Sequence, residues 1–117
     1  MAHPELVDEV ANEVSTWPGV HIENRSPSLA LARYERLELG LLDRDRGVVE
    51  VRFAPLEAER LVEDGEAELP VGPFEGESVS HEVNGPSDVT AVLELLDRRY
   101  RDLRGEDDPY VSQDPPA

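Results

Sequence analysis

The sequence predicts an α+β fold, with an antiparallel sheet of about five or six strands and helices packed on one face. Apolar residues recur at helical spacing near both ends of the 117-residue chain. Between them, short alternating segments follow one another, and a hairpin-length loop separates two of these. Consecutive strands favour antiparallel pairing, and the predicted order of elements is α-β-β-β-β-α-β-β-α.

The first element is predicted to be an amphipathic helix over residues 4–16. Pro4 suits the first turn of a helix, and the apolar residues that follow recur every three or four positions. Pro18 and Gly19 end it, because the residue before a proline avoids the α region and glycine permits a turn. Trp17 is expected to fold back as a large apolar anchor.

The next four elements are predicted to be strands, at residues 20–24, 28–34, 36–42 and 48–53. Leu29 and Leu31 share one face of the second strand. Residues 43–47 form a turn-rich loop ending in glycine, so the last two strands are expected to form a hairpin.

Pairing Leu42 with Val48 sets the predicted register of this hairpin. That register puts an apolar set on one face: Leu37, Leu39 and Leu41 opposite Phe53, Val51 and Val49. The other face pairs Glu38 with Arg52 and also bears Gly40 and Glu50, as expected when one register satisfies both faces. Such a face is more often solvated than functional, but if helices cover only its reverse it is open to a partner or a second copy.

The remaining elements follow from similar signals. A helix is predicted at about 55–64, with Leu56, Ala58, Leu61 and Val62 as its apolar stripe, and Gly65 ends it. Residues 67–71 are expected to be an extended edge, 72–76 a loop, and 77–83 an alternating strand. A last helix enters at residues 85–88 and runs to about Leu103, with its stripe at Val89, Val92, Leu93, Leu96, Tyr100 and Leu103. Residues 1–104 thus form one domain, and 105–117 a disordered acidic tail.

The chain is strongly acidic, with 27 Asp and Glu against 11 basic residues and a formal net charge of −16. All the basic residues are arginine. We interpret this as the surface of a halophilic protein, because molar salt shortens the Debye length to about 3 Å and screens repulsion between carboxylates. An ordinary acidic protein of a mesophile is the alternative.

Several function classes are not expected. Nucleic-acid binding normally begins with a basic face, and the cluster Arg98, Arg99, Arg101 and Arg104 is interleaved with acids. No apolar stretch approaches the ~20 residues of a membrane span, and no secretory signal is evident, so we expect a cytoplasmic protein without a membrane partner. The chain has no Cys, which removes disulfides and thiolate chemistry.

Catalytic and cofactor motifs are also missing from the sequence. No Gly-rich nucleotide loop or Gly-x-Ser-x-Gly elbow occurs, and three histidines without metal-ligand spacing predict no metal site. We therefore expect no cofactor, and an enzyme is the less favoured interpretation. The most interesting single residue is His81, which alternates with two valines and is expected to face the helices. It is more often a hydrogen-bonded structural histidine than a ligand or acid–base group.

A set of short motifs resembles a small family labelled "luciferase domain". They are Trp17-Pro18-Gly19-Val20, Glu38-Leu39-Gly40, residues 49–53, residues 63–68, Asp88-Val89 and residues 95–100, and the resemblance covers about residues 7–103. It suggests a haloarchaeal-type member of this family. Members carry a histidine soon after Glu-x-Gly and another after the second helix, whereas this chain has Leu41-Leu42 and Leu69-Pro70 there. The resemblance therefore implies that any chemistry carried by those histidines is absent here.

Three hypotheses of function follow. The leading one is a non-enzymatic protein-binding or adaptor module that docks a partner on the exposed sheet face, at Glu38, Glu50 and Arg52, or in the helix grooves. The alternative is a small-molecule-binding or degenerate enzyme domain, whose pocket between sheet and helices would be lined by His81, Tyr34 and Arg33. The third is a homodimer built by pairing sheet edges or faces.

The halophilic interpretation predicts a salt-dependent stability. The melting temperature should rise between low and molar KCl, because screening relieves the repulsion among surface carboxylates. Thermal unfolding followed by circular dichroism at both salt concentrations measures this. A melting temperature indifferent to KCl would contradict the interpretation.

Overall fold

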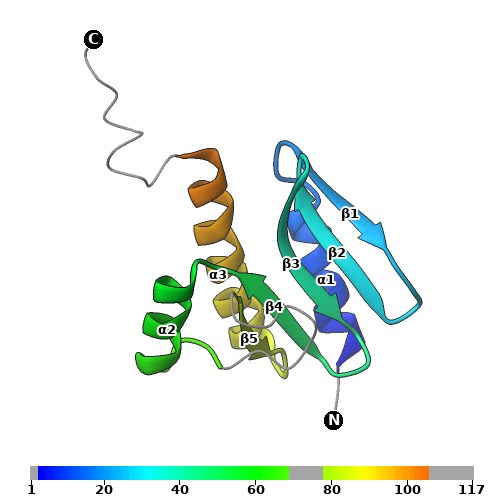
Figure 1. The fold of residues 1–117 in the computed structure, drawn as a ribbon. Helices are drawn as coiled ribbons and strands as arrows, with labels where there is room; N and C mark the ends of the chain where they lie inside the picture. The colour runs from blue at the N-terminus through cyan, green and yellow to red at the C-terminus, as the bar shows by residue number, and fades with distance from the viewer. Residues whose placement is uncertain (1–2, 69–77, 106–117) are drawn as a thin grey trace.

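Three helices and one five-stranded antiparallel sheet make up the fold, which confirms the predicted α+β class (Figure 1). The structure, a computed structural model, describes residues 3–68 and 78–105. The elements are α1 Pro4–Val14, β1 Val20–Asn24, β2 Leu29–Tyr34, β3 Leu37–Asp43, β4 Val48–Arg52, α2 Pro55–Glu63, β5 Ser78–Glu82 and α3 Pro86–Arg104. The strands follow one another in the sheet in the order β1-β2-β3-β4-β5.

The helices lie on one side of this sheet. α1 packs beside α3, and α3 crosses β3, β4 and β5, while α2 packs against β5 (Figure 1). Each helix contributes its buried stripe to the same core, including Val10, Leu61 and Leu96. The sheet contributes Leu39, Leu42, Val49 and Val51, among others. Burying each side chain of this size contributes roughly 1.5–3 kcal/mol, so the core is the main source of stability.

An aromatic cluster ties the end of α3 to the turn between α1 and β1. The Tyr100 ring lies 5.1 Å from the Trp17 ring and 5.4 Å, edge to face, from the Tyr34 ring. The Tyr100 hydroxyl donates a hydrogen bond to the carbonyl oxygen of Pro18 over 2.7 Å. Trp17 is therefore the anchor that the sequence predicts, and its main partner lies on the last helix.

A β-bulge interrupts the pairing of β2 with β3. Ala32 lies opposite Gly40, but the next residue, Arg33, lies opposite Glu38, so Leu39 is the extra residue. The side chain of Leu39 is fully buried in the core. A Cβ added at Gly40 would collide with the carbonyl oxygen of Glu50 and lie 3.2 Å from Leu96 on α3. At Gly40 the backbone of the sheet therefore closely approaches α3.

The predicted hairpin register is wrong by one residue. Leu42 pairs with Val49, and Asp43, which the prediction placed in the loop, pairs with Val48. Asp43 is held there because its carboxylate accepts a hydrogen bond from the Arg46 N–H over 3.0 Å, closing a four-residue turn over 44–47. Such a contact from an aspartate at the start of a turn is invisible to the apolar alternation that set the predicted register.

Two further details differ from the sequence prediction. Leu56 is 66% exposed, so the buried stripe of α2 consists of Ala58 and Leu61, with Val62 packed at its margin. In the predicted edge segment 67–71, Glu68 makes an isolated antiparallel bridge with Ser80. Residues 69–71, the loop 72–76, residue 77 and the tail from 106 onward lie outside the described residues. No helix in the described ranges is both long and apolar enough to cross a membrane.

The close approach at Gly40 predicts a position that tolerates no side chain. We expect Gly40→Ser to lower the free energy of unfolding by about 3 kcal/mol, because the added Cβ must displace backbone or α3. Gly85→Ser is the matched control: no atom lies within 4 Å of its Cβ position, and serine suits this N-cap. Chemical denaturation in molar KCl measures both, and equal stability of the two variants would contradict the packing argument.

Candidate functional site

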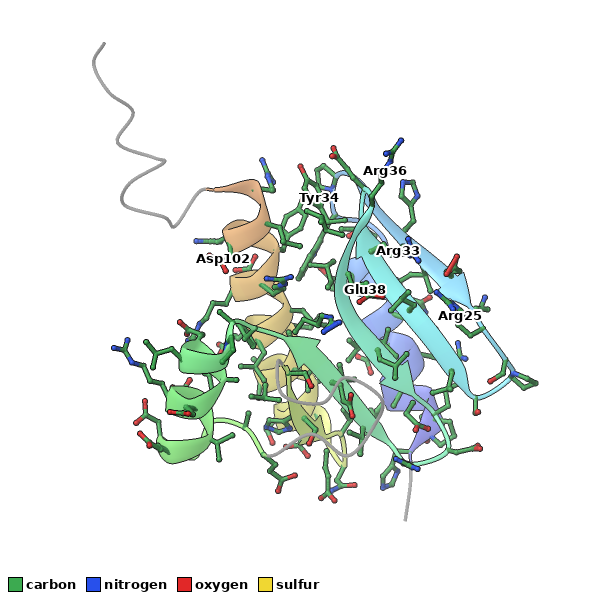
Figure 2. The ribbon with its side chains drawn as sticks, in the orientation of Figure 1. Arg25, Arg33, Tyr34, Arg36, Glu38 and Asp102 are labelled. Atoms are coloured by element: carbon green, nitrogen blue, oxygen red, sulfur yellow. The ribbon has the colours of Figure 1, made fainter. Side chains whose placement is uncertain are left out.

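The candidate site is the sheet surface opposite α1 and α3, here called the outer face. Strand register places its residues in rows that cross the sheet. One row contains His21, Arg33 and Glu38, and the next contains Glu23, Leu31, Leu41, Glu50 and Ser80. Figure 2 shows Arg33 and Glu38 on this side of β2 and β3, with Arg25 and Arg36 near the two ends of the strands.

Ion pairs connect the charged residues of the outer face. The Glu23 carboxylate lies 2.8 Å from Nε of Arg25 and 3.7 Å from Nε of Arg33. On the neighbouring strands, Nε of Arg52 donates to Glu38 over 3.0 Å. Two glutamates thus face three arginines, all partly exposed to solvent. The same face also carries Glu50, Asp43 and Glu82, so it gathers arginines without an excess of positive charge.

The Glu38–Arg52 pair confirms one part of the hairpin prediction although the register is wrong. Leu39 is accommodated in the bulge with its side chain in the core, so Glu38 returns to the outer face. It then meets Arg52 on the same face. The prediction shifted β3 against β4 by one residue and also lacked the one-residue bulge. The two differences offset each other at Glu38, so the predicted pair with Arg52 still forms.

Two other predicted members of the open face are placed differently. Glu50 lies on the outer face, between Leu41 and Ser80, but is only 3% exposed. Gly40 is turned toward Leu96 and does not belong to this face. Leu31 and Leu41 are also buried, yet they are not members of the core cluster under the helices. The outer face therefore has arginines and glutamates above buried leucines, where the sequence predicted a face bearing Glu38, Gly40, Glu50 and Arg52.

The structure does not bring Tyr34, Arg33 and His81 together. Tyr34 packs against Tyr100 on the helix side, whereas its neighbour Arg33 lies on the outer face. His81 is on β5, three strands away from β2 in the sheet. Consecutive residues of a strand point to opposite faces, so Arg33 and Tyr34 cannot line one pocket between sheet and helices. The predicted pocket lined by all three is wrong in its geometry.

His81 borders a shallow depression of about 220 Å³ beside β5. Its other lining residues include four carboxylates, from Glu66, Glu68, Glu82 and Asp88. A ring nitrogen of His81, Nδ1, lies 2.7 Å from the carbonyl oxygen of Glu82. This is the geometry of a hydrogen-bonded histidine on an edge strand. In the described part of the chain, no three His, Asp or Glu side chains are grouped to hold a metal ion.

Other depressions flank Phe53, at the start of α2. One of about 260 Å³ is lined by Arg52, Phe53, Ala54 and Arg99. Another, of about 290 Å³, is lined by Phe53, Glu57, Arg98 and Asp102. Sequence reasoning missed them, because Arg98 and Arg99 approach β4 only once α3 is packed on the sheet.

Sequence reasoning also missed Glu23, Arg25 and Leu31 as members of the site. The signal was present: pairing residues 20–24 with 30–34 would have placed Arg33 beside His21 and Leu31 beside Glu23. Comparisons with protein-family models, curated protein sequences and solved structures gave no significant match to this chain.

The partly exposed Glu38–Arg52 pair predicts a small coupling energy. A double-mutant cycle with Glu38→Ala and Arg52→Ala should give about 0.5 kcal/mol at low salt and less in molar KCl. The pair Asp97–Arg101 on α3, 3.1 Å apart and also exposed, is the matched control. Urea unfolding measures both cycles; a coupling well above that of the control would contradict the interpretation of a solvated pair.

Proposed function

We propose that this chain is a non-enzymatic protein-binding module of a halophile cytoplasm, and that it docks its partner on the outer face of β1–β4. The observation that carries this proposal is the grouping of arginines on one sheet surface. Arg25, Arg33 and Arg52 lie on one sheet surface, each within ion-pair distance of a glutamate, on a chain that has 11 arginines and a net charge of −16.

Electrostatics explains why such a surface suits a protein partner. In a proteome of acidic proteins, most surfaces carry clustered carboxylates, and contact between two such surfaces costs free energy even in salt. Screening over about 3 Å weakens repulsion at a distance but much less at contact. Arginines grouped on a docking face reduce this cost, and they bind carboxylates with directed, often bidentate hydrogen bonds.

The shape of the surface also favours a macromolecule. Small-molecule sites usually enclose roughly 300–1,000 Å³, whereas the depressions described above hold about 220–290 Å³, are open to solvent and lie beside β5 and Phe53. The outer face of β1–β3 is formed by residues of paired neighbouring strands, whose register is interrupted at the Leu39 bulge. Arginine is enriched in protein interfaces, and Leu31 and Leu41 give this surface a packed base.

The resemblance to the luciferase-domain family fits the same proposal. Leu41 and Leu42 follow Gly40 where that family carries a histidine, and both leucines are buried. We therefore propose that the chain is a member of that family that binds and does not catalyse.

Charge reversal on the outer face tests the proposed function. The chain is immobilised at molar KCl, and a stoichiometric partner from a halophilic lysate is identified by mass spectrometry. We expect Arg25→Glu/Arg33→Glu to retain at least about tenfold less of that partner, because interfacial arginines pair with carboxylates. The matched control is Arg60→Glu/Arg101→Glu, at exposed positions of α2 and α3. It makes the same change of charge away from this face and should bind normally.

Two outcomes would contradict the proposal. One is equal capture of the partner by both variants, with thermal melts showing that each is folded. The other is the absence of any stoichiometric partner together with a small molecule that raises the melting temperature of the wild-type chain but not of His81→Ala. The second result would favour the alternative, a small-molecule site in the depression beside His81.

A further inference from the structure

The two edge strands of the sheet, β1 and β5, differ in whether another segment pairs with their outer side. At the β5 edge, Glu68 and Ser80 exchange two backbone hydrogen bonds of 2.7 and 2.8 Å. At the other edge, no strand or bridge within residues 3–68 and 78–105 pairs with the far side of β1. Figure 1 shows β1 as the margin of the sheet, on the side away from α2.

Backbone pairing shows which groups of β1 point to that open margin. Gly19 accepts a hydrogen bond from the Glu35 N–H, and the Arg25 N–H donates to Leu29, so these two flanking residues are turned toward β2. Because the direction alternates along an antiparallel strand, His21 and Glu23 also turn toward β2. The backbone N–H and C=O groups that point outward are therefore those of Val20, Ile22 and Asn24. Of these, the Val20 N–H already donates a hydrogen bond to the carbonyl oxygen of Trp17.

We infer that β1 pairs antiparallel with β1 of a second copy of this chain, with Ile22 opposite Ile22 of the partner copy. In this register each Ile22 N–H donates to the other Ile22 carbonyl, and each Asn24 N–H donates to the other Val20 carbonyl. The pairing is two-fold symmetric, as expected of a closed homodimer. It uses the sheet edge and a second copy, so it goes beyond the proposed function.

The complementarity of an imidazole and a carboxylate across the two-fold axis selects this occupant and this register. With Ile22 at the two-fold axis, His21 of each copy lies opposite Glu23 of the other on the outer face. These are non-hydrogen-bonded pairs, with Cα atoms about 4.5 Å apart, where cross-strand side chains meet most closely. Exposed edge strands usually resist self-pairing through like charges or proline, and β1 (Val-His-Ile-Glu-Asn) has neither against itself.

Packing on the helix side agrees with the same register. Ile22 is only partly buried against the core, at the open margin of the helix layer. The Ile22 of the second copy would cover it. The dimer would also continue one outer face into the next, so that two arginine-rich surfaces lie side by side and a partner could engage both.

Sedimentation velocity of the purified chain in molar KCl tests this inference, with no partner protein present. We expect a concentration-dependent dimer. His21→Glu and Glu23→His each place identical side chains opposite one another, and each should raise the dimer dissociation constant roughly fivefold to tenfold. The double variant His21→Glu/Glu23→His exchanges the two residues, restores the pairing, and should return to within about twofold of the wild type.

Ile22→Pro provides a second probe that spares the fold. The N–H that it removes points to the open margin and not to β2, so proline is tolerated there as at other sheet edges. The dimer, in contrast, loses two main-chain hydrogen bonds, one from each copy. A thermal melt of each variant shows that it is folded. The inference is overturned by a wild-type monomer at every concentration, by a dimer that Ile22→Pro leaves intact, or by failure of the double variant to recover. A failure here leaves the capture experiment with Arg25→Glu/Arg33→Glu unaffected, because that readout needs only one copy.

Discussion

The contact on which the rest of this structure depends is the approach of the sheet to α3 at Gly40. The β3 backbone there lies so close to Glu50 and Leu96 that no side chain fits. The bulge at Leu39 next to it lets two successive residues of one strand serve the helix side. α3 can consequently cross β3, β4 and β5 at close range and pack beside α1. The same bulge restores Glu38 to the outer face, so one local irregularity sets both the core packing and the charge pattern of the opposite surface.

Periodicity in the sequence was sufficient for the elements but not for their register. The helices and strands lie close to where apolar spacing puts them, because burial on one side of a helix or strand imposes its own period. The hairpin register depended instead on a turn closed by Asp43 and on a bulge at Leu39, and both are local hydrogen-bonding features. Alternation alone favoured a register in which Leu37, Leu39 and Leu41 all share the core face. In the structure, Leu41 is buried on the outer face.

The candidate site was less predictable for the same reason. Grouping His81, Tyr34 and Arg33 required knowing the face of each strand, and two neighbours in one strand point in opposite directions. The outer face emerges only when three strands are aligned, which brings Glu23, Arg33 and Glu38 into adjacent rows. In the sequence, the arginines of this face are scattered among acidic residues, and only the pairing of the strands brings them together. Net charge describes the chain as a whole, whereas recognition depends on where the minority charge is placed.

The hydrogen bond from Tyr100 to Pro18 joins residues 82 positions apart, near opposite ends of the domain. Pairing within the sheet is local, because each strand bonds to the next one along the chain. Contacts within the helix layer are not local, because α1 is synthesised first and α3, which packs against it, is synthesised last. During synthesis on the ribosome, the strands β1–β4 can form while the surface that α3 will cover is still open to solvent. The domain therefore completes its core only when its last helix has emerged, and a chain that stops before Tyr100 exposes that apolar surface to aggregation.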